Sequence, residues 1–211
     1  MTIRCSLLLM LLAGTGCLSE LTGPTTEPAP TGTRMATIEV VDAVISPGKS
    51  NHTVWDAVGT VPNDVWSGLA TALAASEPFG AVTGFLNTQS PLIPRPDPFG
   101  TATLLSTYSA EDGVDSPLAT NDNNLQDTFT PTWPTRSHWE DVALTSDLRV
   151  RVSLTDEDLS EHDPIGVVEL SSHDIDAAIA AGQVLHVKVS GQATGQILFV
   201  GLWAQETGVA Q

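Results

Sequence analysis

Cysteine and basic residues are scarce in this sequence, and both shortages limit what the chain can do. The 211 residues hold two cysteines, Cys5 and Cys17. Because Cys5 lies in a segment with the features of an export leader, a mature chain would keep one cysteine and form no internal disulfide. Lysine and arginine number 8 against 25 acidic residues, a formal net charge of −17. This charge argues against binding to nucleic acid, and against binding to anionic lipid without a bridging cation, since both partners are polyanions.

Motifs typical of enzymes are also absent. The sequence has no Gly-x-Ser-x-Gly nucleophile elbow, no His-Glu-x-x-His pair and no phosphate-binding loop. Acid–base hydrolysis by paired carboxylates with His138, His162 or His173 is an alternative that the sequence leaves open. A protein that is not an enzyme is therefore the prediction.

The amino-terminal segment resembles a lipoprotein leader. Arg4 gives it a positive start, and Leu7 through Ala13 form an apolar core too short to span a bilayer. The small residues 14–16 precede Cys17, as in the lipobox of bacterial lipoproteins. That resemblance implies an acylated Cys17 that anchors the chain in the cell envelope, with Leu18 directing it to the outer membrane. An ordinary signal peptide that happens to hold a cysteine is the alternative.

Composition predicts one globular domain behind this leader. The chain is 41% hydrophobic and 16% charged, as globular proteins are. Pro24, Pro28 and Pro30 lie in a segment without apolar periodicity, which indicates an extended tether. The predicted organisation is a signal peptide (1–17), a Thr/Pro-rich tether (18–34), a β-domain (35–206) and a tail (207–211).

Short strands with turn signals between them predict an all-β, antiparallel sandwich. The clearest strand is 148–154, where Leu148, Val150, Val152 and Leu154 alternate with polar residues. Two helices interrupt the pattern. One follows a cap at Asn63-Asp64, and the other covers 174–181 after a cap at Ser171 or Ser172. The predicted strands are 37–45, 101–108, 148–154, 167–170, 184–189 and 196–203, and the polar stretch 110–124 is predicted to be a loop.

Three aspartates follow the clearest strand and predict a cation site. Asp156 and Asp158 are two residues apart, so in an extended chain their carboxylates point the same way, with Cα atoms roughly 6.5–7 Å apart. Asp163 follows, in a segment where Pro164 and Gly166 favour a turn back. Carboxylate oxygens suit Ca²⁺ better than zinc or copper. A solvated acidic loop is the alternative. An EF-hand is excluded, because its sixth and twelfth positions would be Glu161 and Val167.

The pattern Asp-x-Asp-Leu-x-x-x-Asp-x-Ile-Gly at 156–166 resembles the third calcium loop of the C2 domain, the membrane-binding β-sandwich of synaptotagmins and protein kinase C. The resemblance implies an eight-stranded sandwich that binds calcium at one end. It also implies that Asp156, Asp158 and Asp163 are ligands.

A second segment carries the same resemblance. Asp97-Pro98-Phe99 before a strand resembles the Ser-Asp-Pro-Tyr end of the first calcium loop in that family. It implies Asp97 as a ligand and Asp56 as its partner from the start of the loop, with a helical insertion between them. Asp64 competes with Asp56 for that role, and both Asp56 and Asp97 are alternatively turn caps.

The predicted function is a calcium-binding C2-like module on an envelope lipoprotein. Through its acidic loops it would bind phospholipid or an envelope protein. A structural or assembly lipoprotein that has lost calcium binding is the second interpretation.

Overall fold

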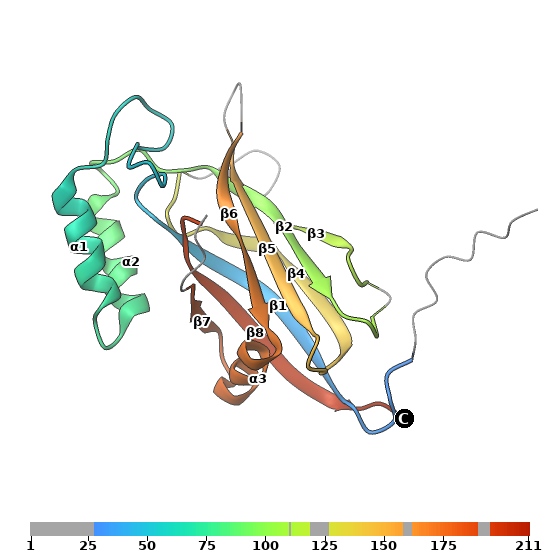
Figure 1. Ribbon diagram of the computed structural model, residues 1–211. Helices are drawn as coiled ribbons and strands as arrows, with labels where there is room; N and C mark the ends of the chain where they lie inside the picture. Colours follow the sequence, from blue (N-terminus) through green and yellow to red (C-terminus); the bar gives the residue numbers. More distant parts are fainter. Residues whose placement is uncertain (1–27, 110, 119–126, 158–161, 190–194) are drawn as a thin grey trace, which may run out of the picture.

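The protein is a β-sandwich of two four-stranded sheets (Figure 1). The computed structural model describes residues 28–109, 111–118, 127–157, 162–189 and 195–211. One sheet has the order β4-β1-β8-β7 and the other β3-β2-β5-β6, and every pairing is antiparallel. The strands are β1 (Arg34–Ile45), β2 (Pro98–Leu105), β3 (Asp115–Leu118), β4 (Thr132–Ala143), β5 (Arg149–Asp156), β6 (Asp163–Ser171), β7 (Leu185–Lys188) and β8 (Ile197–Val209). The predicted eight-stranded antiparallel sandwich is confirmed.

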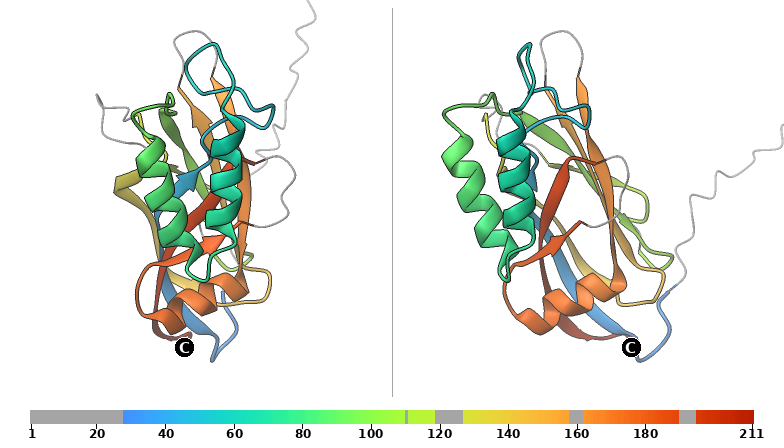
Figure 2. Two further views of the ribbon diagram at one scale, coloured as in Figure 1. Left: turned by 90° about the vertical axis from the view of Figure 1, so that its left-hand side faces the viewer. Right: turned by 60° about the vertical axis from the view of Figure 1, so that its left-hand side comes forward.

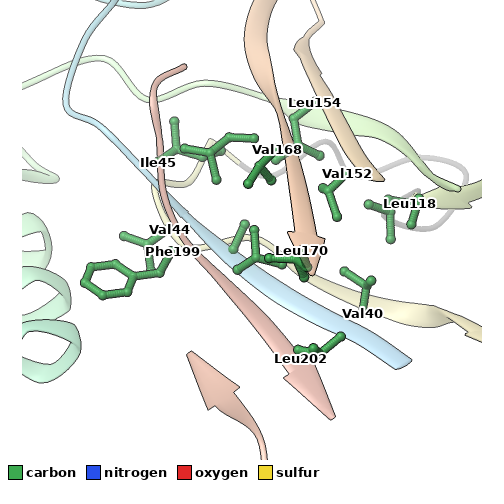
Figure 3. Packing of buried hydrophobic residues seen from close by; sticks show 14 of the residues in the cluster. Val40, Val44, Ile45, Leu118, Val152, Leu154, Val168, Leu170, Phe199 and Leu202 are labelled. Atoms are coloured by element: carbon green, nitrogen blue, oxygen red, sulfur yellow. The ribbon is translucent and has the colours of Figure 1, made fainter. Parts of the chain in front are cut away.

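The core lies between the two sheets. Val40 and Ile45 of β1 face the other sheet, whereas Val44 lies beside Phe199 of β8 on the side of the helical insertion (Figure 3). Val152 and Leu154 of β5 and Val168 and Leu170 of β6 meet them there, and all are buried. In β5 the buried residues alternate with Arg149, Arg151, Ser153 and Thr155, which are partly or fully exposed. This is the period-2 pattern of a strand with one face in the core, and it places Asp156 on the inward face.

Two helices, α1 (Asn63–Leu73) and α2 (Pro78–Gln89), form the insertion between β1 and β2. They lie side by side along one flank of the sandwich (Figure 2). Phe79 of α2 stacks on the ring of His186 in β7, with centroids 3.4 Å apart. The ammonium of Lys188 in β7 donates to the carbonyl of Leu73 (2.8 Å), which satisfies an acceptor at the end of α1. The insertion is therefore docked on the edge strand of its sheet.

The second insertion helix is a correction to the sequence analysis, which predicted only one. Glycines and threonines in α2 obscure its period, and the apolar contacts of Val82 and Leu86 with the core hold it. The cap of α1 also differs from the prediction, because Pro62 occupies the N-cap position and Asn63 begins the helix.

Two further segments differ from their predictions. The predicted loop 110–124 contains β3, whose Pro117 is tolerated because β3 is an edge strand. Strand β6 begins at Asp163 rather than at 167, since a bulge opposite Leu154 and Thr155 accommodates Gly166 at φ 150°. The predicted turn at Pro164 and Gly166 is therefore part of a strand.

The predicted helix after β6 is confirmed as α3 (Ser172–Ala181). Ser171 is the N-cap and forms a capping box with Asp174, and Gly182 ends the helix in the left-handed region. The sheet extends beyond the expected domain limits, because β1 begins at Arg34 and pairs there with Val209 of β8. Within the described residues, no helix is both long and apolar enough to cross a membrane.

Candidate functional site: the acidic end of the sandwich

Three predicted ligand residues converge at one end of the β3-β2-β5-β6 sheet. Asp156, the last residue of β5, lies opposite Asp163, the first residue of β6, and also opposite Pro98 at the start of β2. The N–H of Glu157 donates to the carbonyl of Asp97 (3.0 Å), so the two chain segments run together just beyond the strands. We call Asp97, Asp156 and Asp163 the acidic end. It lies at the top of the molecule in Figure 1, where β6 begins.

The carboxylate of Asp156 is part of the internal structure of this end. Its side chain is fully buried, and its Oδ1 accepts a hydrogen bond from the N–H of Asp97 (2.6 Å). A buried carboxylate is costly unless hydrogen bonds or opposite charges compensate it. Asp156 therefore fixes the start of β2 against the end of β5, and it places Asp97 beside itself.

A lysine contributes positive charge to the acidic end. The ammonium of Lys49, in the loop after β1, forms an ion pair with Oδ2 of Asp163. It also lies 5.5 Å from the ring centroid of Trp55, a cation–π distance. Trp55 is fully buried, and its Nε1–H donates to the carbonyl of Ser46 (3.0 Å). The side chains of Lys49 and Asp163 are 24% and 42% exposed, so their attraction is only partly screened by water.

The sequence analysis did not identify Lys49. Lys49 follows the predicted strand 37–45, and nothing local marks it as a partner of an aspartate 114 positions away. The contact depends on how the loop between β1 and α1 folds back over the strand ends.

The other predicted site residues are placed differently. Asp56 is exposed, has φ 23°, and lines a hollow of about 400 Å³ that also contains Arg95 and Asp127. Asp64 is exposed near the start of α1. Asp158 and Cys17 lie outside the described residues. In the part of the chain that the structure describes, no three histidine, cysteine or acidic side chains are arranged to hold a metal ion.

The acidic end offers oxygen atoms of the type that calcium binds. Calcium takes six to eight oxygen ligands, and carboxylates are typical of them. Asp97, Asp156 and Asp163 offer such oxygens, although one oxygen of Asp156 accepts from a backbone N–H and one of Asp163 binds Lys49. A complete shell would therefore need Asp158, backbone carbonyls or water in addition.

The histidines considered for hydrolysis lie on separate elements. His162 packs edge-on against Phe99 at the acidic end, with ring centroids 5.2 Å apart. His138 is in β4, in the other sheet, and contacts Glu140 (3.1 Å). His173 is in α3, at the opposite end of the molecule (Figure 1). The structure therefore does not bring these three histidines together.

Comparison with known proteins identifies similar folds. No protein-family model matches the sequence, and no curated protein matches it. Among solved structures, the chain is similar to the tandem C2 domains of extended synaptotagmin 2 in a calcium-bound form, with 13% identity and a TM-score of 0.44 over 84% of this chain and 47% of that one.

Two other solved structures are also similar to this chain. A single C2 domain of plant extended synaptotagmin 1 has 12% identity and a TM-score of 0.41, over 84% of this chain and 98% of that one. Human GIVD cytosolic phospholipase A2 has 17% identity and a TM-score of 0.42, over 86% of this chain. The chain spans only 18% of that phospholipase. The solved structures to which this sandwich is similar thus include C2 domains.

Proposed function

We propose that this chain is a non-enzymatic, calcium-binding β-sandwich module, anchored in a bacterial outer membrane through an acylated Cys17. The observation that carries the proposal is the convergence of Asp97, Asp156 and Asp163 at the ends of three adjacent strands. Two unit charges 4 Å apart repel by about 4 kcal/mol at an effective dielectric constant of 20. The side chains are not arranged as a complete metal site in the described residues, but acidic residues held at adjacent strand ends would be stabilised by a cation brought between them.

In this proposal the acidic end and the loop that carries Asp158 hold the ion. Asp163, Asp158 and Asp97 would supply side-chain oxygens, and Asp156 would hold Asp97 in place through its hydrogen bond. Bound calcium would make the local potential less negative and offer a coordination position to a phosphate or carboxylate of a partner. The partner is then an anionic phospholipid or an envelope protein with exposed acidic groups.

The position of the tether supports a role in reaching such a partner. Gly32 and Thr33 form backbone hydrogen bonds with Ala210 (2.9 and 2.8 Å), so the tether enters the sandwich beside the carboxyl terminus. Figures 1 and 2 place this entry at the end of the molecule opposite the acidic end. An anchor at Cys17 would therefore leave the acidic end free to point away from the anchoring membrane.

A thermal melt of the mature chain in calcium and then in chelator tests calcium binding. With a dissociation constant near 1 mM, typical of extracellular calcium modules, 10 mM calcium should stabilise the fold by about 1.4 kcal/mol. The midpoint should rise by about 3–6 °C. Asp158→Asn and Asp163→Asn should abolish the rise, whereas Asp64→Asn, an exposed aspartate near the start of α1, should preserve it. If wild type and both site variants melt alike with and without calcium, the calcium proposal is wrong.

The ion pair of Lys49 with Asp163 favours a second candidate, a structural or assembly lipoprotein that needs no metal. In that case the ion pair with Lys49 offsets the charge of Asp163 without a metal. Sedimentation with anionic and neutral liposomes, each with and without calcium, separates the candidates further. Calcium-dependent sedimentation with the anionic liposomes supports the calcium module with a lipid partner. If the protein sediments with none of these liposomes, the remaining candidates are a calcium module that binds an envelope protein and the structural lipoprotein.

A further inference from the structure

A pocket of about 340 Å³ lies between helix α1 and the sandwich. One side of it is a stripe of α1 that consists of Trp66, Leu69, Ala70 and Leu73. These residues are three or four positions apart and therefore share one face of the helix. The other side is formed by the loop after β1 and by the chain around the start of β8. We call this space the α1 pocket.

The walls of the α1 pocket are largely apolar and uncharged. Among the described residues that line it, none is an aspartate, glutamate, lysine or arginine, although the chain has 25 acidic residues. Three large apolar side chains of the lining, those of Trp66, Leu73 and Leu198, are only half-buried and leave apolar surface in water. A neutral ligand with an apolar body would cover this surface and meet no charge of either sign.

His52 is held at the α1 pocket in a strained backbone conformation. Its φ is 67°, in the left-handed region that residues other than glycine seldom adopt. Its N–H donates to the carbonyl of Lys49 (2.9 Å), and its carbonyl accepts from the N–H of Val61 (2.8 Å). In this position the imidazole packs on the ring of Trp66, with centroids 4.8 Å apart. Strain that a folded loop retains is typical of positions whose side chain has a role.

His52 also has hydrogen-bonding capacity that other polar groups of the lining lack. The Ser46 hydroxyl donates to the carbonyl of Gly48 (2.5 Å). With its amide oriented to satisfy both ends, the side-chain oxygen of Gln196 accepts from the N–H of Ser50 (2.8 Å). Within the part of the chain that the structure describes, neither ring nitrogen of His52 forms a hydrogen bond. A ligand in the pocket can therefore use that ring without breaking an internal contact.

We propose that the α1 pocket binds a small, neutral aromatic molecule and that His52 and Trp66 recognise it. The two rings offer a surface for stacking, and a ring nitrogen of His52 offers one hydrogen bond. A helix of a partner protein fits less well, since a single turn about 10 Å wide and about 5.4 Å long already occupies about 400 Å³. The pocket contains no residue of the acidic end, so this inference is independent of calcium binding.

An NMR titration of the mature chain with 2-naphthol tests the proposal. This probe is a neutral fused ring with one hydroxyl group. The signals of the His52 ring and of the Trp66 indole should shift in a saturable way, with a Kd of about 1 mM or lower, as expected for so few ligand atoms. Naphthalene-2-sulfonate has the same ring and a negative charge. It should bind about fivefold more weakly or less, because the chain carries a net charge of −17.

Three variants locate the binding. Ala70→Trp should abolish it, because Ala70 is an exposed residue of the lining and an indole there would fill the pocket. Thr71→Trp is the matched control, since Thr71 is exposed on another side of α1 and should bind 2-naphthol like wild type. His52→Gly removes the ring at a φ that glycine adopts freely. It should keep the melting midpoint of wild type and bind 2-naphthol about fivefold more weakly.

Each result supports or overturns the inference. Saturable shifts at His52 and Trp66 that Ala70→Trp removes and Thr71→Trp preserves support it. Equal binding by Ala70→Trp, or no shift at either residue up to the solubility of 2-naphthol, overturns it. Equal binding by a folded His52→Gly protein, or equal binding of naphthalene-2-sulfonate, overturns it as well. The rise of the melting midpoint in calcium is a separate measurement, so the calcium proposal can fail or hold independently.

Discussion

Replacing Gly100 by alanine tests the close approach of strands β2 and β5, on which the acidic end depends. Gly100 lies opposite Leu154, two residues along β2 from Pro98, whose partner is Asp156. A Cβ built on Gly100 would lie 1.9 Å from the carbonyl oxygen of Ser153 and 3.1 Å from Cα of Leu154. Both neighbours are backbone atoms, so no rotation of a side chain can relieve the overlap.

The size of the effect follows from this overlap. A carbon and a carbonyl oxygen normally approach no closer than about 3.3 Å. The backbone of β5 must then move by about 1.4 Å relative to β2, against the packing of Val152 and Leu154 in the core. Overpacking of this kind costs about 3 kcal/mol. For a domain of this size the melting midpoint should fall by about 6–12 °C.

Urea unfolding followed by tryptophan fluorescence measures this loss. Gly84→Ala is the matched control, because Gly84 is exposed in α2 and a Cβ there meets no atom within 4 Å. The same chemical change at Gly84 should stabilise the protein by about 0.5–1 kcal/mol, since alanine favours a helix more than glycine does. The two variants should move in opposite directions. A Gly100→Ala protein as stable as wild type would refute the close strand approach.

Two further substitutions test the packing around the sheet ends. The hydroxyl groups of Thr145 and Thr107 lower the pKa of Asp147 to about 2 from its ordinary 3.8. The ionised Asp147 carboxylate therefore contributes fully to folding stability above pH 4, and this contribution is lost as the pH falls through 2. An NMR titration should show this value, Thr107→Val should raise it, and a wild-type value near 3.8 would contradict the contacts. Trp55→Ala should cost about 3–5 kcal/mol in urea unfolding, because it empties a fully buried site and removes the ring beside Lys49. A loss below about 1 kcal/mol would show that the loop is not packed as described.

The sequence by itself determined the elements whose signals are local. Alternation in 148–154 predicted β5, and the same alternation extended by one step puts Asp156 on the inward face. A serine cap at 171 or 172 predicted α3, since a cap acts within the first turn of the helix, and Ser171 is the residue that caps it. The sequence also predicted that Asp163 lies near Asp156, but it relied on a turn at Pro164 and Gly166. The two residues meet instead because β5 and β6 pair as antiparallel strands.

Tertiary structure alone decided the rest. Strand β3 exists because pairing with β2 and burial of Leu118 outweigh a polar sequence with proline, and α2 exists because Val82 and Leu86 reach the core. Asp56 and Arg95 line the same hollow. The spacing of these residues in the sequence did not predict that they would lie together. Lys49 reaches Asp163 only because a loop of the other sheet folds over the strand ends. Such contacts join residues far apart in the chain, so their energy depends on the packing of both sheets rather than on any local pattern.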